Sequence, residues 1–265
     1  MISEIKKNLL GLKKARYFLF HLVSWDIRFK FRGSKIGFLW TILQPLLLTL
    51  IIATVFGFVF DQEMKEYAPY ILSGLLVWDF ILAAIVGNSY CLISAETYVK
   101  QYSHPIILYP LRATLTSVVT FLVAFVAFFV WILFLYPQNI IVGIISLPLT
   151  IMIFGILSWS CSIISSHVHI RYRDYPYVMN LLMQVFWYFS PVFFRDEMFK
   201  QNDVLYSVFL FNPITQILNL IREPFFAGRF AELQTYLYVL CLMLVVVMMA
   251  YYTNKKCEKN VIFFY

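Results

Sequence analysis

The sequence predicts an all-α polytopic membrane protein with six transmembrane helices, an N-terminal amphipathic interfacial helix, and re-entrant helices between spans five and six. Hydrophobic residues make up 62% of the chain and charged residues only 13%, whereas soluble domains carry about 25% charged residues. Uncharged runs of about 20 residues, enough to cross a bilayer as a helix, recur along the chain. Sixteen of the 21 Lys and Arg residues fall in segments that six spans place in the cytoplasm, where basic flanks are retained.

We treat the 265 residues as one domain, with residues 1–36 as a cytoplasmic and interfacial segment, 37–252 as the six-span bundle and 253–265 as a cytoplasmic tail. The four cysteines have no paired spacing, so neither a disulfide framework nor a metal site is expected. The N-terminus lacks the pattern of a removable signal peptide. Because the net charge of +7 is distributed by membrane side, we expect no nucleic-acid partner.

The N-terminal stretch 11–31 has the pattern of an amphipathic helix. The apolar residues of its stripe recur three or four positions apart, and they are Ala15, Phe18, Leu22, Trp25 and Phe29. Polar residues, among them Arg28, gather on the opposite side. This pattern favours a helix in the cytoplasmic interface with its apolar face toward the lipid; the alternative is a helix that packs on a soluble partner.

The first span, residues 37–60, contains no charged residue, and it follows a basic flank that includes Arg32 and Lys35. This flank predicts that the N-terminus is cytoplasmic. Pro45 removes a helix hydrogen bond and frees the carbonyl of Thr41. Since such a break needs protein or water around it, we expect this span to pack inside a bundle.

The later spans are expected at about 68–91, 106–136, 140–165, 177–194 and 235–252. Asp79 lies in the second span, either at membrane depth, where an ionisable residue indicates function, or near the outer interface beside Trp78. Between spans five and six, the apolar pieces Val204–Phe211 and Ile214–Ile221 are too short to cross. Asn212-Pro213 supplies a reversal between them, so the pair is expected to dip into the outer leaflet and return.

The sequence contains few residues in patterns typical of catalysis. There is no GxxxxGK phosphate loop, so the chain cannot hydrolyse ATP in the conventional way by itself. His167 and His169 are two positions apart and would point in different directions on a helix. The spans hold few charges but many aromatic residues, which suit either interfacial belts or a surface along which sugars and lipid chains slide.

Four short motifs follow one another along the chain in the order in which a known family has them. They are Arg32-Gly33-Ser34-Lys35-Ile36-Gly37-Phe38-Leu39-Trp40 running on to Gln44-Pro45, then Arg173-Asp174, then Ser190-Pro191-Val192, and then Asn212-Pro213 with Arg222. Over nearly its whole length the chain resembles the permease subunit of ABC-2-type exporters of bacterial surface polysaccharides, namely O-antigen, capsule or teichoic acid. It departs from that pattern at Ile36, where Leu is usual, and at Ala95-Glu96. The second departure falls where the partner would dock.

The resemblance implies a transport subunit and not an enzyme. It implies a homodimer with two separate ATPase subunits, which would bind ATP and Mg while this chain binds no cofactor. The substrate would be an undecaprenyl-pyrophosphate-linked polysaccharide moved outward across the bacterial inner membrane, with both termini cytoplasmic. The alternatives are an ABC-2 exporter of a drug or small lipid, and a membrane-embedded transferase that uses Asp79 or the histidines.

Three groups of residues are expected to act in such an exporter. The coupling contact to the ATPase would use Glu96, Lys100 and Gln101, and the interfacial helix Phe18, Leu22, Trp25, Phe29, Arg28 and Arg32. The channel and gate candidates are Asp79, Trp187, Tyr188, Phe194, Asn212, Pro213, Ile217 and Arg222.

Overall fold

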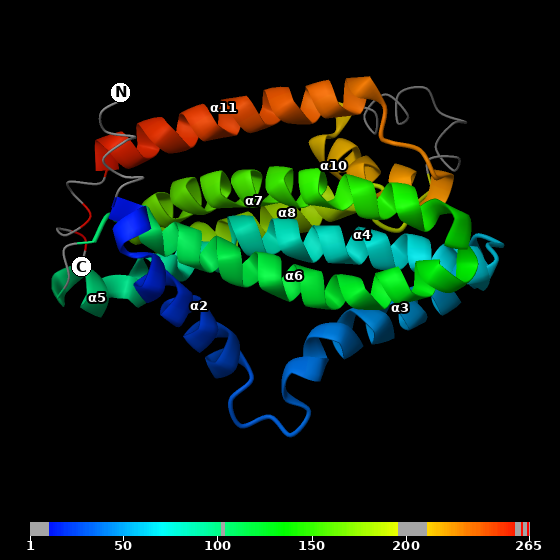
Figure 1. Cartoon of the computed structure of the whole chain (residues 1–265), viewed down its shortest axis with the longest axis horizontal. Helices are drawn as coiled ribbons and strands as arrows, with labels where there is room; N and C mark the ends of the chain where they lie inside the picture. Colours follow the sequence, from blue (N-terminus) through cyan, green and yellow to red (C-terminus); the bar gives the residue numbers. More distant parts are fainter. Residues whose placement is uncertain (1–10, 102–103, 196–210, 258–260, 262–263, 265) are drawn as a thin grey trace.

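The computed structural model describes residues 11–101, 104–195, 211–257, 261 and 264, and every regular element in them is helical. Four long helices lie side by side (Figure 1), namely α4 (Met64–Ile85), α6 (Leu108–Leu135), α7 (Ile140–Arg171) and α11 (Leu233–Cys257). Together with the stretch that contains α3 (Trp40–Val59), five helical stretches of the described chain are long and apolar enough to cross a membrane. The prediction of an all-helical, multi-pass membrane protein is therefore confirmed.

The two ends of this bundle carry different small elements (Figure 1). At one end, called here the α5 end, α2 (Arg16–Lys30) begins, α11 ends and α5 (Glu96–Gln101) lies on the side of the bundle opposite α11. At the other, the α10 end, α10 (Pro213–Arg222) and the π-helical turn Glu223–Ala227 lie near the start of α11. These two ends hold the candidate functional residues described below.

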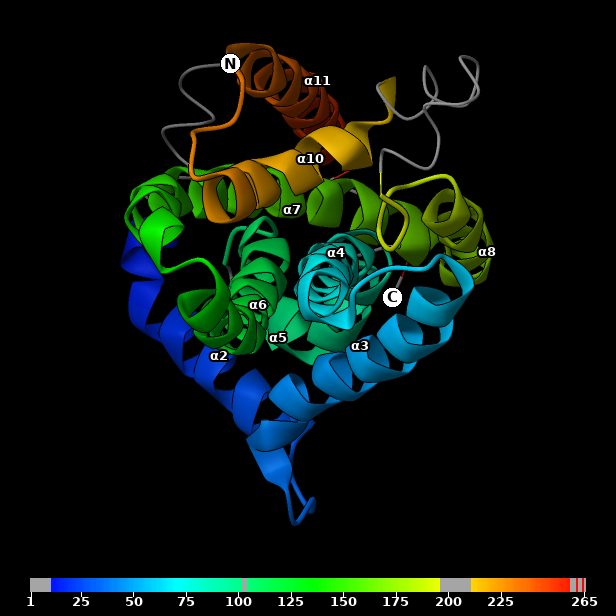
Figure 2. The ribbon, with the colours of Figure 1, turned by 90° about the vertical axis from the view of Figure 1, so that its right-hand side faces the viewer.

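Helix α4 lies at the centre, with α3, α6 and α7 around it, and α11 lies on the far side of α7 (Figure 2). The apolar residues of α4 are not confined to one stripe, so this helix can be buried on several sides at once. Ile71, Leu72 and Val77 are fully buried in the main hydrophobic core, which also takes Phe128 from α6 and Phe225 from the π-helical turn. Helices α2 and α3 form a V whose arms pack on α6 and α4 and whose connecting loop projects away from the bundle (Figure 2).

The helix boundaries differ from the predicted ones at three places. Helix α7 runs to Arg171 and does not end at residue 165, while α4 starts at Met64 and gives way to a 3₁₀ turn at Gly87–Cys91. The expected fifth span, 177–194, overlaps α8 (Tyr175–Tyr188), whose 14 residues fall short of a full crossing helix.

The two apolar pieces between spans five and six have separate outcomes. The expected helix over Ile214–Ile221 is confirmed, since α10 covers it. The piece Val204–Phe211 lies outside the described residues except for Phe211.

Candidate functional site

A second hydrophobic core, separate from the main one, lies at the α5 end. We call it the α5-end cluster; its buried residues are Ala15, Leu22, Cys91, Leu92, Ala95, Ile106, Leu108, Tyr109, Ile170 and Val261. They come from α2, from the turns that lead into α5, from the start of α6 and from the end of α7. The turns that precede α5 are therefore packed against the rest of the protein.

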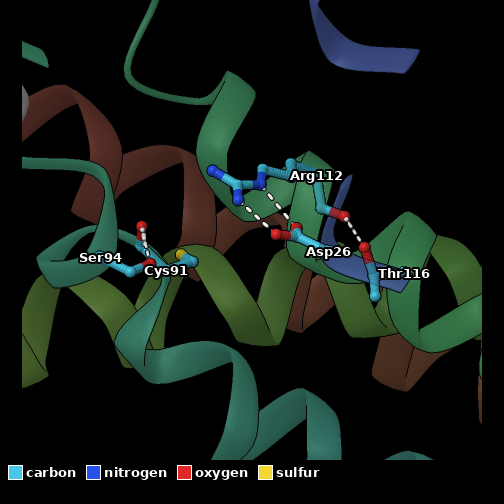
Figure 3. A network of polar contacts seen from close by, with 5 residues as sticks. All are labelled: Asp26, Cys91, Ser94, Arg112 and Thr116. Atoms are coloured by element: carbon cyan, nitrogen blue, oxygen red, sulfur yellow. Dashed lines mark hydrogen bonds and ion pairs between the residues drawn. The ribbon is translucent and has the colours of Figure 1, made fainter. Parts of the chain in front are cut away.

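An ion pair joins α2 to α6 beside this cluster (Figure 3). Arg112 donates from Nε to Asp26 Oδ2 at 2.6 Å and from Nη2 to Asp26 Oδ1, so the contact is bidentate. The side chains are only 13% and 27% exposed. Arg112 also lies 5.9 Å from the ring centre of Tyr98 on α5. A paired, partly buried arginine of this kind fixes orientation because both of its donors must fit at once.

The expected coupling residues form the exposed side of α5. Lys100 Nζ and Glu96 Oε1 are 2.6 Å apart one helical turn from each other, with about half of each side chain exposed. Gln101 ends the helix and is exposed. An exposed pair one turn apart adds little stability, so these groups remain available to a partner surface.

The expected interfacial stripe of α2 is divided between two environments. Leu22 is buried and Phe18 partly buried against the α5-end cluster, where Phe18 also stacks on His104 at 4.8 Å between ring centres. Trp25 and Phe29 are 57% and 60% exposed and stack on each other. Arg28 and Arg32 are exposed as well. Part of the apolar face therefore docks on the protein, and the rest is available to lipid.

At the α10 end, Arg222 is the centre of a buried polar group. We call the group the Arg222 node; it consists of Arg222, Tyr70, Ser73, Gly74, Pro191 and Val192. Arg222 is 7% exposed and donates to the carbonyl oxygens of Pro191 at 2.7 Å and Val192 at 3.0 Å. It also donates to the Tyr70 hydroxyl at 2.8 Å, and its guanidinium lies 3.7 Å from the centre of that ring. The side chain thus faces the protein interior and joins three segments.

Asn212 begins α10 and ties it to the end of α8. Its side-chain oxygen accepts a hydrogen bond from the Ile214 amide at 2.9 Å, as an N-cap residue does. Its amide nitrogen donates to the Phe189 carbonyl at 2.9 Å and to Ser190 Oγ at 3.0 Å. Pro213 takes the first helical position, which suits its missing N–H.

The remaining gate candidates differ in exposure. Ile217 is 9% exposed and packs in the main hydrophobic core. Trp187 is partly buried against Trp78 at 5.1 Å between ring centres, while Tyr188 next to it is 60% exposed. The Phe194 carbonyl accepts a hydrogen bond from Tyr70. Of these candidates, Tyr188 offers the largest free surface.

Asp79 is an exposed residue of α4 between the buried residues Trp78 and Phe80. It lies 15 residues after Met64, about 22 Å along a helix, so the structure does not place it near the end of α4 where Met64 lies. Burial lowers the pKa of Lys30 at the end of α2, and the negative charge of Asp79 opposes that shift.

The structure thus brings most of the predicted coupling and gate residues into two separate places, around α5 and around α10, but Asp79 belongs to neither. Several central residues were not predicted: Asp26 and Arg112 at one end, Tyr70, Ser73 and Gly74 at the other. A charge at the inner edge of a span, such as Arg112, and a Gly inside a helix, such as Gly74, were the available signals.

Comparison with known proteins gives one family and several relatives. The ABC-2 type transporter family model matches residues 17–226. The chain is similar to the O-antigen export system permease protein RfbA of Klebsiella pneumoniae, with 23% identity over 93% of this chain and 96% of that protein. It is also similar to RfbA of Myxococcus xanthus (20% identity, 83% and 85% covered) and to the polysialic acid transport protein KpsM of Escherichia coli (26% identity, 78% and 80% covered).

Proposed function

The chain belongs to the ABC-2 type transporter family, and we propose that it is the membrane-spanning subunit of an ATP-driven exporter of a lipid-linked surface polysaccharide. The observation that carries this proposal is that relatives named for O-antigen export and for polysialic acid transport both align over most of their length. Both names refer to the transport of a polysaccharide, although the sugars differ. A cargo of this kind suits a bundle with many aromatic side chains and few intramembrane charges.

We further propose that this subunit works as a homodimer with two ATPase subunits in the bacterial inner membrane. ATP and Mg would be bound by those partners. The exposed side of α5, with Glu96 and Lys100, would contact the ATPase, since charged groups at such a contact give specificity. The exposed aromatic residues of α2, Trp25 and Phe29, would lie in the cytoplasmic interface.

The proposed bundle has six crossings, of which α8 begins the fifth. Tyr175, the first residue of α8, donates to the carbonyl of Ile85 at 3.2 Å. After α8, the carbonyl of Phe193 accepts a hydrogen bond from Tyr67 at 2.8 Å. Tyr67 and Ile85 are 18 residues apart on α4, about 27 Å along a helix, which approaches the thickness of the hydrocarbon core. In this arrangement α10 would be the re-entrant helix beside the gate.

Deleting the gene is the test of the transported substrate. The expected result is loss of the polysaccharide from the cell surface, accumulation of the lipid-linked chain inside, and recovery of both by a plasmid copy. A strain with an inactive partner ATPase should show the same accumulation. Unchanged surface polysaccharide together with greater sensitivity to a drug would favour the drug or small-lipid exporter instead.

Membrane sidedness is tested by cysteine labelling of intact cells, in a variant whose four native cysteines are replaced. Cysteines at Glu63 and Arg195 should be modified by an impermeant thiol reagent, and one at Arg173 should react only after the cells are opened. Arg195 pairs with Glu66 at 3.7 Å, which puts it at the same end of the bundle as Glu63. Reaction of the Arg173 position in intact cells would contradict the six-crossing topology.

A further inference from the structure

The interfacial helix α2 makes direct contacts with the segment proposed to receive the ATPase. Phe18 on α2 packs edge-on against Tyr98 on α5 with ring centres 5.9 Å apart. Both residues border the α5-end cluster, in which Leu22 from α2 and Ala95 from the turn before α5 are buried together. A displacement of α5 alone would open this apolar contact to water, which is unfavourable.

The Asp26–Arg112 ion pair extends the same contact to the long helix α6. Arg112 lies in the second turn of α6, and its guanidinium is held by Asp26 and faces the ring of Tyr98. One side chain therefore contacts α2 and α5 while it belongs to a membrane-crossing helix. Because the pair is bidentate and partly buried, separating it would leave a poorly solvated charge on each side.

We propose that α2, α5 and the inner end of α6 move as one body, and that the Asp26–Arg112 pair is the positioning contact through which movement of α5 reaches the membrane-crossing helices. The proposal rests on the proposed function, because it takes α5 as the contact to the ATPase. Neither residue touches the transported polysaccharide. Their role is to keep the contact between α2, α5 and α6 rigid, so that a displacement of α5 also displaces α6.

The ratio of export to ATP hydrolysis tests this role. For Asp26→Asn and for Arg112→Gln, we expect normal assembly with the ATPase and hydrolysis within about twofold of the parent, but export reduced roughly tenfold or more, since each change leaves one partner of the pair uncompensated. Asp26→Glu should retain most export. The exchanged pair, Asp26→Arg with Arg112→Asp, should recover at least several-fold over either single variant. Glu232→Gln, in an exposed ion pair at the other end, is the matched control.

A tether gives an independent test that does not depend on removing the ion pair. Cysteines at Phe18 and Tyr98, in the background without native cysteines, are joined by a short bifunctional thiol reagent. If α2 and α5 move together, export should continue with the tether formed. A tether that stops export while the reagent leaves the untethered background active would show that the two helices separate during transport, and would overturn the proposal.

The outcomes separate this proposal from the proposed function. If the parent protein exports no polysaccharide, the proposed function fails before any variant is compared. If the parent exports and the two single variants export at the parental ratio to ATP hydrolysis, the proposed function stands and the role of the ion pair is wrong. If a single variant fails to assemble, the exchanged pair and the tether still decide the question.

Discussion

Replacing Arg222 with methionine is expected to destabilise the protein strongly and to abolish export. The substitution leaves the carbonyl oxygens of Pro191 and Val192 without the donors they have in the structure. An unsatisfied buried acceptor costs about 1–3 kcal/mol, so the loss should reach roughly 3 kcal/mol or more for several acceptors. Thermal unfolding of the purified protein in detergent should then show a midpoint lower by roughly 6 °C or more.

Arg222→Lys separates the role of charge from the role of geometry. Lysine keeps the positive charge but lacks the planar fork that reaches several acceptors at once. We therefore expect it to recover only a minor part of the lost stability. Arg229→Lys is the control, because Arg229 lies on the same connection with 63% of its side chain exposed. A lysine variant as stable as the parent would show that the Arg222 node needs only a charge.

The apolar spans were predictable because burial in lipid or protein requires continuous hydrophobic runs, but their ends were not. Helix α7 was expected to stop at residue 165, just before the polar stretch that contains His167 and His169. The structure continues it to Arg171, and two polar groups beyond residue 165 bond to the helix itself: Ser166 donates to the Ile163 carbonyl at 3.2 Å, and His167 Nδ1 contacts the same carbonyl at 2.8 Å. Hydropathy counts such residues as breaks, although the helix backbone supplies their partners.

The end of α8 was not predictable for the opposite reason. The backbone carbonyls that follow it accept hydrogen bonds from side chains remote in sequence: Asn212 donates to Phe189, Tyr67 to Phe193 and Arg222 to Pro191. A run of apolar residues from 177 to 194 gives no sign of these partners, so the whole run was interpreted as helix. Asn212 and Arg222 were selected as gate residues, but nothing local indicated that they face inward and hold α8 to α10.

The Asp26–Arg112 pair shows the same limit at the α5 end. The two residues are 86 positions apart. Each charge is already accounted for by its local sequence, because Asp26 can be assigned to the solvated side of an amphipathic helix and Arg112 to the edge of a membrane span. The periodicity of α2 indicates one apolar face. It cannot indicate that Phe18 and Leu22 meet protein while Trp25 and Phe29 stay exposed, because that division depends on the α5-end cluster, most of whose residues are remote in sequence from α2.

Gly74→Ala is expected to have the second large effect, by forcing apart α4 and the segment after α8. A Cβ atom at Gly74 would lie 2.1 Å from the carbonyl oxygen of Val192 and 2.9 Å from Nη2 of Arg222. The first is a backbone atom held by Arg222, so it cannot turn aside as the tip of a flexible side chain would. The added methyl group should therefore displace the Val192 segment and break the Arg222 node.

Gly155→Ala is the matched control, because Gly155 also lies inside a long helix but a Cβ atom there would meet nothing within 4 Å. In a helix, Ala is otherwise favoured over Gly by roughly 0.5–1 kcal/mol, so Gly155→Ala should raise the unfolding midpoint slightly. The two substitutions are chemically identical and should shift the midpoint in opposite directions. If Gly74→Ala also raised it and left export intact, the close approach of α4 to Val192 would not be needed for the folded or the working protein.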